Sequence, residues 1–227
     1  NLISCTYDKA NTIIGWAKHS FTDFEIVSVS AARFSGTDRV WIALWDPIQS
    51  KHSVCIMAGI TAPDIYCDSS IRQDYSTPTT TVTGLGHLEG RTVKVMTNGS
   101  IHPDRVVTGG QITLQYAATA VIVGVGYTRQ ITTMPIDFSD KEGITEVRHK
   151  HLGKVYVRVK SSVRPMINGV RPATRYPATP MDTRDPLQSE DIQALSLGWQ
   201  QRETITVSED LPLPLTIISV FAEIGTS

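Results

Sequence analysis

Apolar and polar residues alternate with a period of two along most of the chain, which is typical of half-buried β-strands. The alternating runs are rich in β-branched and aromatic residues and are separated by turn formers such as Gly, Asp, Asn and Pro. They predict strands at residues 13–19, 24–31, 39–45, 53–57, 92–97, 100–107, 111–116, 120–127, 154–160, 204–208 and 215–222. No long stretch has the apolar spacing of an amphipathic helix, so the predicted fold class is all-β.

Three local signals add detail to this pattern. Asn98-Gly99 favours a two-residue type I′ turn between strands 92–97 and 100–107, because both residues reach positive φ easily. Two glycines in the apolar run 120–127 indicate a bend or a close approach of backbones. In the run 154–160 the valines are expected to face inward and the Lys, Tyr and Arg residues outward, whereas residues 144–152 fit either a helical turn or an extended arm.

The predicted architecture consists of antiparallel sheets, arranged as small β-barrel or sandwich modules, with a long Pro-rich loop. Three regions are expected: 1–75, 76–135 and 136–227. The loop at 161–191 carries five of the twelve prolines, and a structureless loop of that length is unusual in a compact domain. Its apolar residues are expected to pack against something, with a neighbouring subunit as a candidate: Met166, Ile167, Val170, Tyr176, Met181 and Leu187.

Composition excludes several classes. The 21 Lys+Arg against 22 Asp+Glu give a net charge of -1, which favours neither a nucleic-acid binder nor a membrane-surface binder. The longest apolar runs are too short to cross a bilayer. Cys5, Cys55 and Cys67 fit no zinc or redox spacing and are expected to be reduced, mostly buried thiols. The chain opens at Asn1, which predicts a processed product or, preferably, an excerpt of a longer polypeptide.

The sequence predicts no catalytic, cofactor-binding or metal-binding residue. His149 and His151 share a strand face, but a metal site needs more ligands than two histidines. His87 and Glu89 are better explained by a tight turn, with the Glu89 carboxylate bound to turn backbone, than by acid–base chemistry. Four tryptophans fit core or interface packing by default, with a sugar-stacking platform as the alternative: Trp16, Trp41, Trp45 and Trp199.

A set of short motifs resembles, in order along the chain, the tail nozzle proteins of short-tailed bacteriophages (the tail tubular protein B family). Residues 82–95 read VTGLGHLEGRTVKV and precede the Asn98-Gly99 turn, similar to the family's GLxHLEGxxVxV stretch and turn. The other matches are TYD at 6–8, GWAKH at 15–19, GGQITL at 109–114, VIVGVGYT at 121–128 and LPLPLTI at 211–217. The matches extend over residues 6–223. The chain departs from the family at Gly126, where the family has proline, and after Ser161.

The resemblance implies a longer parent protein, with further β structure upstream, that assembles as a six-fold ring around the DNA exit channel. It implies a structural, non-enzymatic subunit of the virion tail, assembled in the host cytoplasm and without membrane insertion. Its partners would be copies of itself (a hexameric homo-oligomer), other phage tail proteins and, in passing, DNA. Two other classes remain open: a carbohydrate- or receptor-binding β module with exposed Trp and Tyr, and a glycan hydrolase with two carboxylates converging in a cleft.

Charge is unevenly distributed near the C-terminus. Residues 141–175 contain nine basic and two acidic residues (+7), and residues 176–210 contain seven acidic and two basic ones (-5). Opposite patches on one subunit suit a head-to-tail interface in a ring, although pairing within one subunit or a basic face toward DNA would also use them. The candidate subunit-interface residues are Arg164, Arg171, Arg175, Asp182, Asp185 and Asp191.

Overall fold

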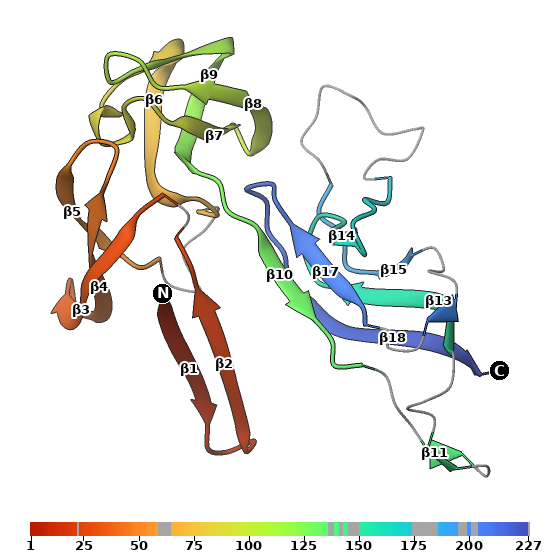
Figure 1. Cartoon of the computed structure of the whole chain (residues 1–227). Helices are drawn as coiled ribbons and strands as arrows, with labels where there is room; N and C mark the ends of the chain where they lie inside the picture. The colour runs from red at the N-terminus through yellow and green to blue at the C-terminus, as the bar shows by residue number, and fades with distance from the viewer. Residues whose placement is uncertain are drawn as a thin grey trace.

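The computed structural model describes residues 1–21, 23–58, 65–135, 139–140, 143–144, 150–173, 186–194, 199–200 and 204–226. Within these ranges the chain forms strands β1 to β18, one short 3-10 helix and no α-helix (Figure 1), which confirms the all-β prediction. All strand pairs described are antiparallel. In the described part of the chain the sheets are open, and none closes into a barrel.

The N-terminal strands form a hairpin and a separate three-stranded sheet. The hairpin contains β1 (Leu2–Asp8) and β2 (Ile13–His19), and the sheet contains β3 (Glu25–Phe34), β4 (Thr37–Asp46) and β5 (Lys51–Ile56) in the order β3-β4-β5. Asp8 Oδ1 accepts hydrogen bonds from the backbone N–H groups of Ala10 and Asn11, which fixes the hairpin turn. These bounds confirm the strands predicted at 13–19, 24–31, 39–45 and 53–57.

A four-stranded sheet follows, in the order β6-β9-β7-β8. Its strands are β6 (Asp68–Val82), β7 (Thr92–Thr97), β8 (Ser100–Val106) and β9 (Ile112–Val125), with the 3-10 helix η1 (Gly86–Leu88) between β6 and β7. Asn98 (φ 51) and Gly99 (φ 80) are both left-handed between β7 and β8, which confirms the predicted turn. The close approach expected in this region is also confirmed, since a Cβ on Gly124 would lie 2.5 Å from the Cβ of Cys67.

One strand prediction in this sheet is wrong, and one strand was missed. The runs 111–116 and 120–127, expected as two strands, form the single strand β9. The 15-residue strand β6 was not expected at all, because its segment is rich in Ser and Thr and contains Pro78, without apolar alternation. Pairing with β9 gives β6 its extended conformation, and three register shifts between the two strands accommodate its irregular sequence.

The C-terminal half contains two further sheets and a short hairpin. The strands are β10 (Arg129–Thr132), β11 (Ser139–Asp140), β12 (Gly143–Ile144), β13 (Lys150–Val159), β14 (Met166–Ile167), β15 (Asp191–Ala194), β16 (Trp199–Gln200), β17 (Thr206–Glu209) and β18 (Ile217–Thr226). β10, β17 and β14 form one sheet, β11 pairs β12, and β13 pairs β15, β16 and β18. Val155, Val157 and Val159 of β13 are almost fully buried, whereas Lys154, Arg158 and Lys160 are exposed, as predicted.

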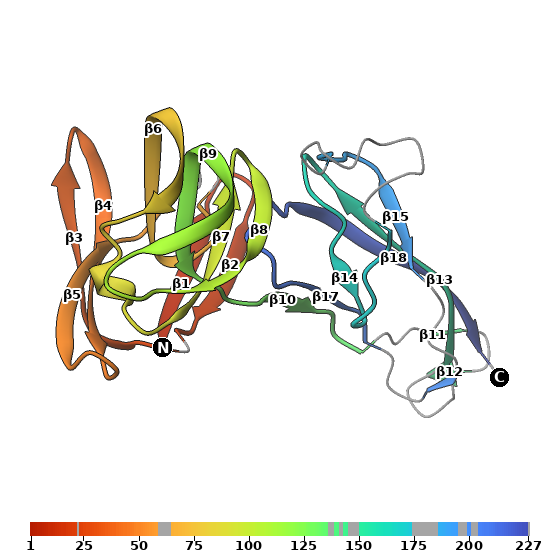
Figure 2. The same ribbon diagram turned by 90° about the horizontal axis from the view of Figure 1, so that it is seen from above.

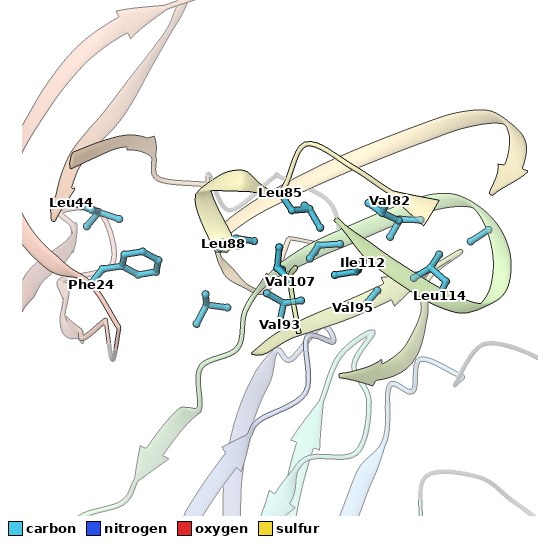
Figure 3. Packing of buried hydrophobic residues seen from close by; sticks show 14 of the residues in the cluster. Phe24, Leu44, Val82, Leu85, Leu88, Val93, Val95, Val107, Ile112 and Leu114 are labelled. Carbon is cyan, nitrogen blue, oxygen red and sulfur yellow. The ribbon is translucent and has the colours of Figure 1, made fainter. Parts of the chain in front are cut away.

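The buried residues form two hydrophobic cores, and β1–β9 and β10–β18 make up two groups in space (Figure 2). The first core joins Phe24 and Leu44 to the residues around η1 and β9 (Figure 3), and the second surrounds β13. The expected boundary between 75 and 76 therefore falls inside β6 and inside one core. The expected boundary between 135 and 136 lies beyond β10, which already belongs to a sheet of the second group.

Candidate functional site

Two arginines fix the described parts of the Pro-rich segment: Arg164 joins parts of the segment to one another, and Arg171 joins the segment to β17. The Arg164 guanidinium donates to Glu190 Oε1 at 2.6 Å, to Gln188 Oε1 at 2.7 Å and to the Ala173 carbonyl at 2.7 Å. Arg171 donates through both Nη atoms to the carboxylate of Glu209, at 2.9 and 2.7 Å. Glu209 is fully buried and the Arg171 side chain is 24% exposed, so the carboxylate of this bidentate pair is shielded from water and the pair is stronger than a fully exposed one.

Asp191, a third residue of the predicted interface, also has its partner in the same chain. Both of its carboxylate oxygens accept from Arg158, at 2.7 and 2.8 Å, across the β13–β15 pair. The hydrogen bonds from Arg158 lower the pKa of Asp191 and raise that of Arg158. Both side chains are substantially exposed, so the pair adds little stability.

The six interface candidates thus fall into two sets. Arg164, Arg171 and Asp191 form ion pairs within the chain. This agrees with the alternative that the two charge blocks pair within one subunit. Arg175, Asp182 and Asp185 lie outside the described residues, so the intersubunit role stays a prediction. Of the apolar residues in the segment, Ile167 is buried and Met166 half-buried, whereas Val170 is 58% and Leu187 41% exposed. Tyr176 and Met181 lie outside the described residues.

The GLGHLEG segment is a structural element that joins two turns. Leu85 and Leu88 are fully buried in the first core. The Glu89 carboxylate accepts from the backbone N–H groups of Gly109 and Gly110, at 2.8 and 2.6 Å. The expected bond of Glu89 to turn backbone is confirmed, but the turn is the one between β8 and β9, twenty residues downstream of its own.

A buried cation beside this segment was not anticipated from the sequence. Arg91 is 3% exposed, and its Nη2 donates to Asp46 Oδ1 at 2.7 Å. Its Nη1 lies 3.0 Å from Asp23 Oδ2, and its guanidinium stands 4.2 Å from the centre of the Phe24 ring. Arg91 therefore joins the β3–β4–β5 sheet to the four-stranded sheet. Its main partner is 45 residues away in sequence, a separation that no local pattern reveals.

The three tryptophans whose side chains the structure describes do not form a single platform. Trp41 and Trp45 are half-buried on the outer side of β4, where Trp41 makes an edge contact with Phe34 and Trp45 lies against His52. Trp16 is 73% exposed on β2, so it does not pack in a core of this chain, and interface packing, the other half of the expectation, stays a prediction. Trp199 lies in β16, opposite His151 of β13, and its side chain is outside the described residues.

Three carboxylates line one pocket of about 280 Å³ that lies where the two groups of strands meet. Each of them has a cationic partner: Asp23 pairs with Arg91, Asp104 with Lys94, and Asp210 with Arg171. A glycosidase instead needs one carboxyl group that keeps its proton and faces a second one across the substrate. In the described part of the chain, no group of three or more His, Cys, Asp or Glu side chains could hold a metal ion. His149 lies outside that part.

The cysteines are free, but only one is fully buried. Cys67 is buried, Cys55 is half-buried and Cys5 is exposed, so the expectation of mostly buried thiols is wrong for Cys5. Burial raises the pKa of the Cys67 thiol to about 12 and also raises that of Cys55. A nucleophilic cysteine needs the opposite shift, toward the thiolate.

The comparisons with known proteins add no assignment: the chain matches no protein-family model and no curated protein. Among the described residues, the structure also contains no helix with the length and apolar character needed to span a bilayer. The resemblance to tail nozzle proteins therefore rests on the ordered motifs.

Proposed function

We propose that the chain is a structural subunit of the tail of a short-tailed phage. It would assemble with copies of itself as a ring, six-fold by the resemblance, around the path of DNA ejection and dock other tail proteins. The structural observation that carries an assembly role is the amount of apolar side chain exposed on sheet faces. Trp16 is 73%, Val54 67% and Ile3 65% exposed, in two separate sheets. Large exposed apolar patches mark interaction surfaces in soluble proteins.

The choice of a phage tail within this class is supported by the ordered motifs. The GLGHLEG motif forms η1 and its flanking glycines adopt φ values of 79 (Gly84) and 76 (Gly90), so the motif's residue types serve the fold. The LPLPLTI motif leads into β18 and buries Leu213. Both motifs therefore have structural reasons to keep their spacing, as expected for a shared fold without a shared catalytic site.

A receptor- or carbohydrate-binding module is the second candidate, and the Trp41–Trp45 pair favours it. The half-buried indole rings of Trp41 and Trp45 lie on one sheet face, four positions apart, and could stack on different sugar rings of one glycan. This reading predicts binding to glycans by a monomer or trimer, and loss of that binding when either tryptophan is replaced by alanine.

Oligomeric state and location test the proposal directly. Electron microscopy and native mass of the parent protein should show closed rings with six-fold symmetry, and antibodies against residues 1–227 should label the tails of virions. A parent protein that remains monomeric or trimeric and binds glycans would contradict the proposal and support the second candidate.

The predicted charged interface needs a narrower test than the sequence alone suggested. Reversing Arg164 or Arg171 would break ion pairs within the chain, so weaker assembly of those variants would not report on an interface. Arg175→Glu is the informative change, with Asp182→Lys and Asp185→Lys in the same chain as the compensating pair. Assembly that is weakened by the first change and restored by the second is expected, whereas rings that form equally well with Arg175→Glu would contradict the charged interface.

A further inference from the structure

The β1–β2 hairpin has one apolar face that is exposed to solvent. The register pairs Ile3 with Lys18, Cys5 with Trp16 and Tyr7 with Ile14, and residues directly opposite each other share a face. The exposed fractions are 65% for Ile3, 64% for Tyr7, 61% for Ile14 and 73% for Trp16. We call these six residues the hairpin face.

This hairpin lacks the support that a two-stranded sheet normally needs. Among the described residues β1 and β2 pair only with each other, and an isolated hairpin is marginally stable in water. Leu2, on the opposite side, packs against the first core, so the hairpin is attached at its base by one side only. An apolar face on such an element indicates that something covers it.

The β3–β4–β5 sheet also has an apolar face that is not covered. Ile42 and Leu44 point into the first core, and the alternate residues of β4 point the other way. On that second side the register brings together Phe34, Trp41, Ala43, Trp45, Val54 and Ile56, which we call the outer face. An antiparallel sheet with one solvated face normally carries polar residues there. Here Val54 is 67%, Phe34 51% and Ile56 41% exposed.

Together the two faces present enough apolar surface for an interface, and they overlap in length. From the exposed fractions, they would together remove roughly 1,000 Å² of mostly apolar surface, which reaches the threshold for a specific protein–protein interface. Ile14 and Lys18 are four positions apart on the hairpin, and Trp41 and Trp45 are four positions apart on β4, so the hairpin face is as long as the Trp41–Trp45 part of the outer face, about 13 Å along the strands. Phe34, at the level of Thr37, extends the outer face beyond this part. Two flat sheets of this kind pack face to face with a separation of about 10 Å.

Charge selects one of the two orientations. Lys18 lies at the base end of the hairpin face, and Glu25 lies beside Trp45 at one end of the outer face. Arg39, opposite Ala32 of β3, lies on the outer face between Trp41 and Phe34, away from the Glu25 end. Opposite charges that meet across an interface fix its register, so the hairpin should be oriented with Lys18 near Glu25 and away from Arg39.

The hairpin cannot reach the outer face of its own chain. Phe24, just before β3, is 6% exposed and belongs to the same core as Ile42 and Leu44. The chain therefore passes from the hairpin to β3 on the core side of the sheet, opposite the outer face. Reaching that face would require Phe24 to leave the core.

We infer that the hairpin face of one copy docks on the outer face of a second copy. The contact is head-to-tail, because each copy contributes a different surface, and such contacts produce rings or filaments. This inference rests on the proposed ring function and names the surfaces that would build it.

Complementary variants test the contact in the whole chain. Trp16→Glu disables the hairpin face and Val54→Glu disables the outer face, and each variant alone should associate roughly 30-fold more weakly or worse. An equal mixture should form dimers and stop there, because one intact hairpin face meets one intact outer face. Val106→Glu, at a residue 57% exposed on β8, is the matched control and should associate like the wild type. Circular dichroism checks that each variant folds.

Cross-linking gives a second measurement that uses the exposed Cys5 on the hairpin face. With Ala43→Cys on the outer face, a short bismaleimide should join different copies, in a yield that rises with protein concentration. Cys5→Ser added to Ala43→Cys should abolish these products. A reagent with some reach is needed because the two sheets would lie too far apart for a direct disulfide.

Each outcome separates the contact from the proposed function. Association that survives either glutamate variant, a mixture that forms no dimer, or a wild-type chain that stays monomeric overturns the contact. Rings that persist with both faces disabled overturn it too, and leave the ring function intact. If the variants, the mixture and the cross-links behave as expected but antibodies do not label virion tails, the contact between copies stands and the tail function is refuted.

Discussion

Replacing the buried cation Arg91 by methionine should destabilise the chain more than any other single arginine change in the first group of strands. Methionine keeps most of the apolar volume and removes the guanidinium. Asp46, which is 4% exposed, would then lose its 2.7 Å partner while keeping backbone donors at Ile48 and Gln49. The change therefore isolates the charge pair from the packing around it.

Breaking a buried ion pair by removing one partner costs about 3–5 kcal/mol, because the other charge remains desolvated. The two backbone donors that Asp46 keeps place the expected loss for Arg91→Met at about 3 kcal/mol, the lower end. Asp46→Asn should cost less, since Arg91 retains Asp23, whose side chain is 39% exposed. The double variant should be more stable than the sum of the single losses predicts, by about 1.5 kcal/mol or more.

Urea unfolding measures these differences, followed by circular dichroism and by tryptophan fluorescence. Trp41 and Trp45 on β4 report on the sheet that Arg91 holds, so the fluorescence transition should shift most. Arg105→Met is the matched control, since the Arg105 Nε donates to one exposed backbone carbonyl, that of Thr113. If Arg91→Met cost no more than Arg105→Met, or if the two losses in the Arg91/Asp46 cycle were additive, the reasoning would be refuted.

Three further predictions concern single residues. Gly99→Val should cost about 1–2 kcal/mol, because a β-branched residue clashes at φ 80, and an unchanged melting temperature would contradict this. Burial raises the pKa of Asp68 from 3.8 to about 6, so the folded state binds its proton more tightly than the unfolded state does. The stability that proton binding at Asp68 gives the folded state is therefore fully present below about pH 4 and is lost as pH rises through about 6. Asp68→Asn should raise the free energy of unfolding, measured with urea, by roughly 1–3 kcal/mol at pH 7.5 and by little at pH 4. An equal gain at both pH values would argue against the raised pKa. Glu89→Gln should cost about 1–2 kcal/mol, since a neutral amide offers one oxygen to two backbone N–H groups, and hydrogen exchange should speed up at Gly109 and Gly110 but not at the turn residue Gly36.

Local patterns predicted the strands whose alternation and turns agree. β4, β5, β7 and β13 were found because apolar residues recur at every second position and because turn formers, such as Asn98-Gly99 after β7, mark the strand ends. β6 was missed because its strand depends on a partner strand 30 or more residues away and not on its own composition. The same dependence on a partner strand explains the error in β9. The small residues between its two predicted runs carry no apolar alternation, so the sequence pattern divided one strand into two.

The candidate site shows the same division between local and long-range information. The two charge blocks were visible in the sequence, but their pairing within the chain depends on how β13, β15 and β17 are arranged. Arg91 and Asp46 carry no sequence signal that joins them, since each precedes or ends a strand for independent local reasons. The alternation pattern also cannot reveal an exposed apolar face, because a strand that is apolar on both sides has the same sequence pattern as a strand buried in a core.

The geometry of the β1–β2 hairpin also determines how the chain would respond to mechanical load. Leu2 pairs with His19, so β1 begins and β2 ends at the same end of the hairpin. Residue 1 and the connection to β3 therefore both leave the hairpin from that end. A pull from the side of residue 1 would load the inter-strand hydrogen bonds one after another, starting at this pair, instead of shearing all of them together. Tension arriving there would open the hairpin at low force, and the extended residues would lengthen the connection before the force reached the first core.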